Sequence, residues 1–258
     1  MNPTTFEVAE YLDEILLTSS VPDYPNAVNG LQLANSGRVT SIAAAVDFSS
    51  RTVARTVEAG ANLMLVHHGM FWSGMRPVTG VVYARLRTLL DNDIAVYSSH
   101  LPLDRHPEFG NNVLLCEQLG LVPSGQFAEF KGSSIGVSGD ADVTTDELVE
   151  RARILARNNG GEVITTPFRT GRRTRQWGVC AGAGASAETL AEAAARGIDT
   201  LIVGEGPHWT AVEAADTGMA IIYAGHYATE TLGVAALSRH LSDRFGLEWT
   251  MVHAPTGL

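Results

Sequence analysis

Short apolar runs alternate with amphipathic helical stretches along almost the whole chain of 258 residues. In the first half these segments are SIAAAVD (41–47), a helical stretch at 49–60, LMLVHH (63–68), a helical stretch at 83–93, IAVYSSH (94–100) and a helical stretch at 111–121. The order strand, helix, strand is typical of right-handed crossovers between parallel strands. A similar alternation begins again near residue 133. We therefore predict an α/β protein with mainly parallel sheets.

Local signals mark the ends of several of these segments. Ser49 is a predicted helix N-cap and Gly60 a helix stop. The spacing of Thr144 and Glu147 is that of a capping box, which places a helix start there. The polar segment RTGRRTR (169–175) predicts the tip of a hairpin.

Composition narrows the class of protein. The formal net charge is −10, from 18 basic and 28 acidic residues, and this makes a nucleic-acid partner unlikely because such binding needs a basic face. No apolar run approaches the ~20 residues that a bilayer span needs, and the acidic N-terminal region is unlike a signal peptide. Cys116 and Cys180 form no CxxC pair, so we expect two buried thiols, a reducing compartment and a cytoplasmic location without a membrane.

Five potential metal ligands lie where predicted strands end. They are His67 and His68 in LMLVHHG, Asp104 in SSHLPLDRH, and His226 and Glu230 in IIYAGHYATE. A set of imidazoles and carboxylates without cysteine binds a catalytic first-row metal more often than a structural zinc. Five ligands exceed the needs of one open tetrahedral site, and two of them are carboxylates that can bridge. The pattern predicts two metal ions.

The positions of these residues support a shared site. Open parallel sheets bind ligands beyond the carboxyl ends of their strands. In a continuing strand His67 and His68 would point to opposite faces, so both reach one site only if the strand stops there, as Gly69 suggests. Their imidazoles then diverge, which favours one histidine on each metal. The alternatives are buried core histidines, a turn-forming Asp104, and a Glu230 that only stabilises a helix N-terminus.

A site that combines these residues constrains the domain organisation, because its ligands come from both halves of the chain. The C-terminal segment would have to return to the first domain. With the best boundary candidate at 123–134, we predict a metal-site domain of residues 1–125 plus 223–258. Residues 126–222 would form a second α/β domain inserted in the first.

Six stretches carry a resemblance to a known family. They are VNGLQLANSG (28–37), AAVDFSSRTV (44–53), ANLMLVHHGMFW (61–72), YSSHLPLDRHPEFGNN (97–112), LIVGEGPHWTAVEAAD (201–216) and YAGHYATETLGV (223–234). They resemble the Nif-three-like dinuclear metal centre proteins, some of which carry the name GTP cyclohydrolase type two. The resemblance implies two interlocked α/β domains, a dinuclear centre and a toroidal homohexamer built as a trimer of dimers.

Carried onto this chain, the resemblance gives the same five ligands, with Asp104 and Glu230 as the expected bridges. One departure is His208-Trp209, where many relatives have two histidines. The expected cofactors are two divalent metal ions per chain, with Zn, Mn, Fe, Co and Ni all compatible with the ligands.

Beyond the ligands, Glu205 and His100 are candidates for proton transfer or for orienting a ligand, and Asp47 has a similar status. The alternative for each is a purely structural role. Arginines of segment 169–175 could hold a polyanion such as a nucleoside triphosphate, or could form a solvated loop. Aromatic residues near the ligands, among them Trp72, could stack on a base or could be packing residues.

Two functions remain open. The first is a dinuclear metal-dependent hydrolase that acts on a nucleotide, by ring opening of GTP or by cleavage of a phosphoester. The second is a metal-binding or metal-trafficking protein, or a hexameric regulatory scaffold, without turnover. The sequence contains no unambiguous substrate motif that decides between them.

Overall fold

The computed structural model describes residues 2–258 and divides the chain into two compact units. The first unit comprises residues 1–103 and 233–254, and the second comprises residues 104–232 and 255–258. Within the described residues no helix is long and apolar enough to cross a membrane.

A five-stranded sheet forms the centre of the first unit. Its strands, in spatial order, are β1 (Gly30–Leu33), β4 (Ala95–Ser98), β3 (Leu63–His68), β2 (Ser41–Asp47) and β11 (Glu248–Met251). The pairs β4–β3, β3–β2 and β2–β11 are parallel, whereas β1 pairs with β4 in the antiparallel sense. The predicted parallel crossovers therefore hold for this sheet.

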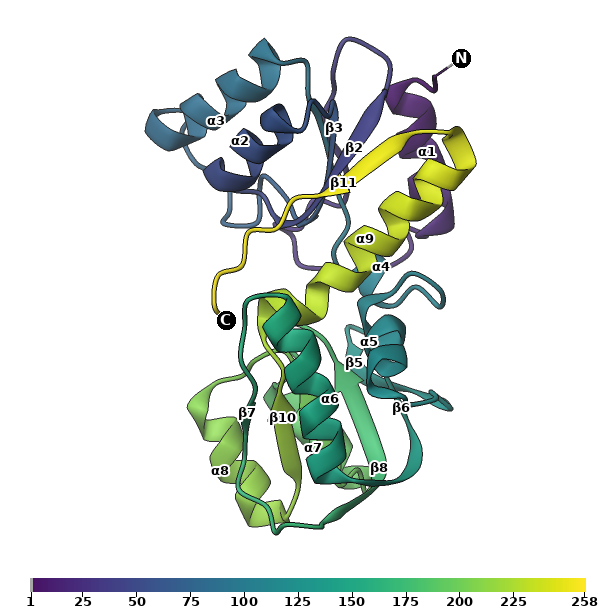
Figure 1. Cartoon of the computed structure of the whole chain (residues 1–258), viewed down its shortest axis with the longest axis vertical. Coiled ribbons are helices and arrows are strands. Elements are labelled where there is room, and N and C mark those ends of the chain that lie inside the picture. The colour runs from purple at the N-terminus through teal and green to yellow at the C-terminus, as the bar shows by residue number, and fades with distance from the viewer. Residues whose placement is uncertain (1) are drawn as a thin grey trace. The chain divides into compact units, whose positions relative to one another are not determined.

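Helices cover both faces of this sheet (Figure 1). The helices of this unit are α1 (Thr5–Ile15), α2 (Ser50–Glu58), α3 (Gly80–Asp91) and most of α9 (His226–Phe245), and the short α4 (Leu101–Asp104) follows β4. Helix α2 begins at the predicted cap, because the Ser49 side chain accepts a hydrogen bond from the Thr52 amide. Val53 of α2 and Leu89 of α3 pack on Met64 and Val66 of β3 in one hydrophobic core.

A six-stranded mixed sheet forms the centre of the second unit. Its strands, in spatial order, are β5 (Gly125–Phe130), β6 (Ser133–Thr144), β8 (Arg173–Cys180), β9 (Thr200–Val203), β10 (Ala220–Tyr223) and β7 (Ile164–Thr165). Only β8–β9 and β9–β10 pair in parallel. The expectation of mainly parallel sheets is therefore wrong for this unit, although the α/β class itself is confirmed.

A tight turn explains why β5 and β6 pair in the antiparallel sense. The strands β5 and β6 are joined by Lys131 and Gly132, whose φ angles of 48° and 80° are those of a tight hairpin turn. The predicted hairpin at 169–175 is wrong, because β7 before it pairs with β10 and not with β8. The segment from 123 to 134 that we expected to separate domains instead supplies β5 and this turn.

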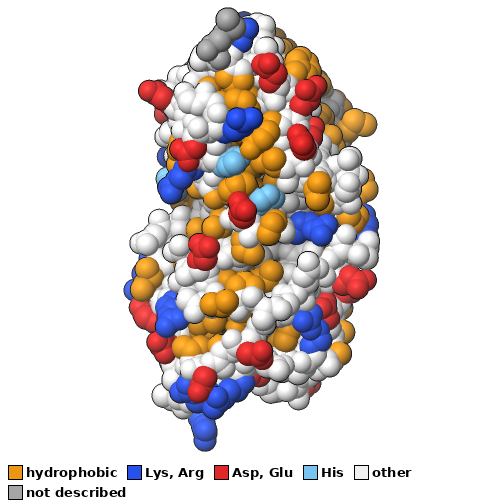
Figure 2. Space-filling model, turned by 90° about the vertical axis from the view of Figure 1, so that its right-hand side faces the viewer, with side chains coloured by type: hydrophobic (Ala, Val, Ile, Leu, Met, Phe, Trp, Pro, Cys, Tyr) orange, Lys and Arg blue, Asp and Glu red, His pale blue; other side chains and the backbone are white. Residues whose placement is uncertain are grey.

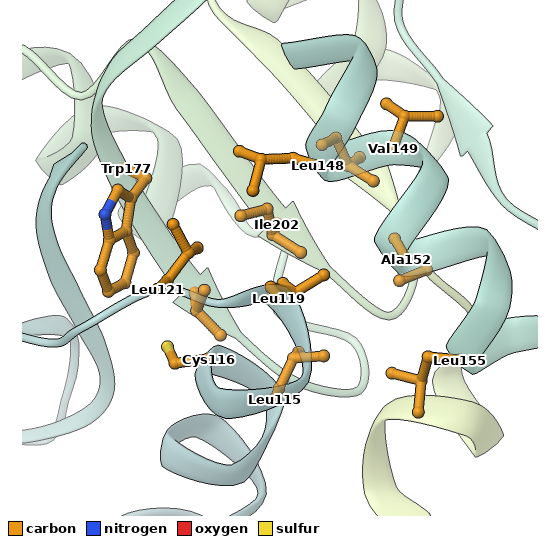
Figure 3. Packing of buried hydrophobic residues seen from close by; sticks show 13 residues of the cluster. Leu115, Cys116, Leu119, Leu121, Leu148, Val149, Ala152, Leu155, Trp177 and Ile202 are labelled. Carbon is orange, nitrogen blue, oxygen red and sulfur yellow. The ribbon is translucent and has the colours of Figure 1, made fainter. Parts of the chain in front are cut away.

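The helices of the second unit are α5 (Asn111–Leu119), α6 (Thr145–Asn158), α7 (Ala187–Ala195), α8 (His208–Thr217) and the start of α9. On one face of the sheet, Leu115 of α5 and Leu148 of α6 belong to one core with Trp177 and Ile202 (Figure 3). On the other face, Leu201 packs with side chains of α7 and α8. Neighbouring residues of β9 thus enter opposite cores, as the alternation of side chains in a strand requires.

The division between the units lies at residue 104 and not at residue 126. Helix α5 accounts for this, because its Leu115, Cys116 and Leu119 are buried in the core of the second unit. Helix α9 begins in the second unit and ends in the first, so the chain passes between the units more than once.

Candidate metal centre

Three histidine side chains meet at the carboxyl ends of β3 and β4 in the first unit. His67 and His68 are the last residues of β3, His100 follows β4, and all three are buried. The ring centroid of His67 lies 4.9 Å from those of both other histidines, and one nitrogen of each ring lies within 4.8 Å of the others. Because β3 and β4 are parallel, their carboxyl ends share one edge, where these imidazoles can serve as metal donors.

Each of these rings has an acceptor at its Nδ1 atom. The distance is 2.9 Å in every case, to the backbone oxygen of Ser99 from His67, to Asp47 Oδ1 from His68, and to Asp23 Oδ1 from His100. An acceptor at Nδ1 keeps the proton on that nitrogen and gives Nε2 the lone pair that a metal needs. This arrangement is typical of histidines that bind metals.

Asp23 is a member of this site that the sequence did not reveal. Besides His100, its carboxylate accepts hydrogen bonds from the Asn29 side chain and from the Leu101 amide. Burial alone would raise the pKa of Asp23. The hydrogen bond and the charge of His100, together with hydrogen bonds from the Asn29 side chain and the Tyr24 amide, outweigh burial and hold this pKa below its usual range. A carboxylate that stays ionised here fixes the imidazole of His100.

The second unit supplies an imidazole and a carboxylate on one turn of α9. His226 is the first residue of this helix, and its Nε2 lies 3.1 Å from Oε2 of Glu230, four positions later. On its other side, His226 Nδ1 lies 2.7 Å from Oε1 of Glu205, which follows β9. Glu230 is buried and lies one turn after the start of the helix.

These two carboxylates control the protonation of His226. Burial lowers its pKa, but Glu230 and then Glu205 outweigh burial and raise the pKa to about 9. Without a metal, the ring therefore carries a proton at neutral pH. A divalent cation at Nε2 would displace the proton there and would meet the Glu230 carboxylate, so metal binding should release protons.

Backbone geometry leaves room for the Glu230 carboxylate. A Cβ at Gly182 would lie 2.0 Å from Glu230 Oε1 and 3.4 Å from His226 Nε2. Gly182 also has a φ angle of 62°, which favours glycine. The turn after β8 thus fits around this ligand pair only because it lacks a side chain.

Asp104 is buried in the same unit, at the end of α4. Its Oδ1 accepts a hydrogen bond of 2.8 Å from the Asn111 side chain. Burial, and then the negative charges of Asp104 and Glu230, raise the pKa of the Cys180 thiol. Both carboxylates are therefore near this cysteine, whose thiol stays protonated in the metal-free chain.

The donors fit a divalent first-row metal. The first unit offers imidazoles whose Nδ1 atoms contact oxygen acceptors. The second unit offers the His226 imidazole and the buried carboxylates of Asp104 and Glu230. Neutral imidazole and carboxylate together suit Zn, Fe, Mn, Co and Ni.

A sequence model described as Duf34/NIF3 (NGG1p interacting factor 3) matches residues 3–256. The chain belongs to this family. The family assignment that the motifs predicted is therefore confirmed.

Relatives in the Duf34/NIF3 family extend over the same length. A Deinococcus radiodurans protein named GTP cyclohydrolase 1 type 2 homolog is 38% identical over 254 residues, which cover 98% of this chain and 94% of that protein. A solved structure titled protein ybgI, of unknown function, has a TM-score of 0.87 and 32% identity over 100% of both chains. A Thermus thermophilus protein of known structure has a TM-score of 0.83 and 31% identity, also over 100% of both chains.

The structure places every predicted ligand of this family member in one of two groups. His67 and His68 lie with His100 in the first unit, while Asp104, His226 and Glu230 lie in the second. That these five predicted ligands serve one dinuclear centre, with one histidine per metal, stays a prediction. His100 is a candidate for proton transfer or for orienting a ligand, and its ring lies with two other imidazoles that could hold a metal ion. Glu205, the other such candidate, contacts His226.

Three of the four arginines of segment 169–175 pair with acidic side chains. Arg173 and Arg175 both pair with Asp142, and Arg172 pairs with Asp199. On the face drawn in Figure 2, acidic side chains likewise lie among the basic ones. Trp209, which stands where many relatives have a second histidine, is 42% exposed in the first turn of α8.

Proposed function

We propose that the chain is a metal-dependent hydrolase that holds two divalent ions through His67, His68, Asp104, His226 and Glu230. The observation that carries this proposal is the Nδ1 partner at each histidine of the set. Such partners fix the tautomer and the ring orientation that metal binding requires.

A nucleotide is the proposed substrate class. Curated relatives carry the name GTP cyclohydrolase 1 type 2 homolog, which motivates ring opening of GTP or cleavage of a phosphoester as the reaction. When bound, paired divalent ions would polarise the reacting centre and lower the pKa of water.

The chain's own residues would position the ligands and move protons. Glu205 holds the Nδ1 proton of His226, so that this ring keeps its orientation while protons are exchanged elsewhere. Asp23 does the same for His100, whose imidazole is the proposed proton carrier. Asp47 holds His68.

Substitution of Glu230 tests the assignment. Metal-loaded protein should turn over GTP or a phosphodiester, and Glu230→Gln should abolish turnover and reduce bound metal. The matched control is Glu213→Gln on the exposed side of α8, which should change neither. Full activity in Glu230→Gln would refute the site. Metal binding without turnover of a broad substrate panel would instead favour the non-catalytic metal-binding or scaffold function.

We also propose that the chain assembles as a homohexamer, a trimer of dimers. The family resemblance supports this assembly, and Val81, Tyr83 and Leu90 of α3 are exposed apolar side chains that such an interface would cover. Light scattering coupled to size exclusion should give six copies of the chain. A monomer at micromolar concentration would contradict the proposal.

A further inference from the structure

A cavity of about 440 Å³ lies in the first unit beside one of the proposed metal ligands. His68 and Asp47 form part of its wall, and the rest comes from the end of β1, from Phe48, from the loop after β3 and from the first turns of α3. This volume is within the ~300–1,000 Å³ of ordinary small-molecule sites. A molecule bound there would lie against the His68 imidazole.

Three aromatic side chains line this cavity, namely Phe48, Phe71 and Trp72. The Trp72 ring is held in place, since its centroid lies 4.5 Å from that of His68 and 4.4 Å from that of His100. The Trp72 backbone oxygen also accepts a hydrogen bond from the Asn26 side chain. Immobilised aromatic faces bind planar rings by stacking, at little cost in conformational entropy.

Two guanidinium groups, of Arg76 and Arg85, line the same cavity. Arg85 lies over the Phe48 ring, 5.1 Å from its centroid, and donates one hydrogen bond of 3.3 Å from Nη1 to the Phe48 backbone oxygen. Its Nε is buried and has no hydrogen-bond partner among residues 2–258. A buried N–H group without an acceptor is costly, and a ligand anion is the acceptor that guanidinium binds best.

The carboxylate of Asp47 in the same wall offsets only one of the two guanidinium charges, so the lining keeps a net positive charge. The cavity therefore combines aromatic walls with positive charge on the side of α3. A purely apolar ligand would leave the guanidinium charges of Arg76 and Arg85 without a counter-ion, and a free inorganic anion would leave the aromatic walls unused.

We propose that this cavity is a binding site for a planar heteroaromatic ring that bears an anionic group, as in a nucleoside monophosphate. Trp72 and Phe48 would contact the ring, and Arg85, assisted by Arg76, would bind the anion. The inference deepens the proposed function, on which it rests for the fate of the ligand; binding itself needs no metal.

Calorimetric titration of the full-length, metal-free protein tests this directly. The probe is guanosine 5′-monophosphate, with guanosine and ribose 5-phosphate as its two halves. We expect the monophosphate to bind and each half to bind at least about tenfold more weakly, because one loses the contact with Arg85 and the other loses the stacking. No binding of the monophosphate, or equal binding of ribose 5-phosphate, would overturn the proposal.

Single substitutions test which side chains of the cavity bind the monophosphate. Arg85→Met should weaken binding of the monophosphate about tenfold or more and leave guanosine unchanged. Arg87→Met is the matched control on the same helix, because Arg87 is exposed and pairs with Asp91. Trp72→Leu should weaken the monophosphate and guanosine alike, and Trp72→Phe should restore most of the affinity. Equal affinity in Arg85→Met, Trp72→Leu and the unchanged protein would overturn the proposal.

The test separates the cavity from the proposed reaction. If metal-loaded protein turns nothing over while the metal-free protein binds the monophosphate through Arg85 and Trp72, the hydrolase proposal fails and the binding site stands. If turnover occurs while the metal-free protein binds no monophosphate, the binding site fails and the hydrolase proposal stands.

Discussion

Replacing Gly182 by alanine should disturb the proposed metal ligands without unfolding the protein. The added Cβ would lie 2.0 Å from Oε1 of Glu230, which is the mobile end of a side chain and can move away. The backbone strain of a left-handed residue should cost roughly 1–2 kcal/mol, and loss of the Glu230 contact with His226 adds to it. For a chain of this size such a cost corresponds to a fall in melting temperature of about 2–8 °C.

The effect on metal binding should be larger, because Glu230 is displaced together with its contact to His226. Loss of groups that only orient a ligand typically weakens metal binding roughly 10–100-fold, and displacement of a ligand should weaken it at least as much. Competition with a chromophoric chelator measures the affinity, and thermal unfolding of the metal-free protein measures the stability.

Gly171→Ala provides the matched control. Its φ angle of 72° imposes the same backbone strain, but a Cβ there would meet nothing within 4 Å among the described residues. Gly171→Ala should therefore lower the melting temperature by the amount that backbone strain causes, and it should leave the metal affinity unchanged. Unchanged metal affinity in Gly182→Ala, or an equal loss in both variants, would refute the reasoning.

Three further predictions concern protonation and packing. The pKa of His226 is raised from 6.5 to about 9, so its contribution to the free energy of unfolding of the metal-free protein is complete below pH 6.5 and is lost as the pH rises through 9. Urea unfolding should show this fall in the free energy of unfolding, and Glu205→Gln should make the fall smaller. Ile202→Ala should lower the free energy of unfolding by about 2–5 kcal/mol, whereas Ile154→Ala on an exposed site should change it by less than about 0.5 kcal/mol; equal urea midpoints would contradict this. Asp23→Asn should cost about 1–3 kcal/mol in the same assay, and an unchanged midpoint would show that its hydrogen bonds do not matter.

The alternation of apolar and helical segments was enough to predict the α/β class. It succeeded best for β2, β3 and β4, whose apolar runs are buried on both faces of a parallel sheet. It failed for the second sheet. The two-residue turn at Lys131 and Gly132 makes β6 antiparallel to β5, and a turn this short has no periodic pattern of apolar residues. The short β7 pairs with a strand far along the chain, which no local pattern encodes.

Motif positions likewise predicted the histidine and carboxylate groups but not what surrounds them. His67 and His68 are visible because they adjoin a strong apolar run. Asp23 is separated from His100 by 77 positions and lies in an irregular loop, so only the folded chain reveals their contact. No local pattern marks Gly182, because the close approach of Glu230 to this position appears only in the folded chain.

The metal content of the purified protein tests the central claim most directly. Elemental analysis of protein expressed with divalent metals and freed of loosely bound ions should give two divalent ions per chain. Glu230→Gln and His67→Gln should each lose bound metal, while Glu213→Gln should keep it. A chain without stoichiometric metal, or the same metal content in all three variants, would contradict the account.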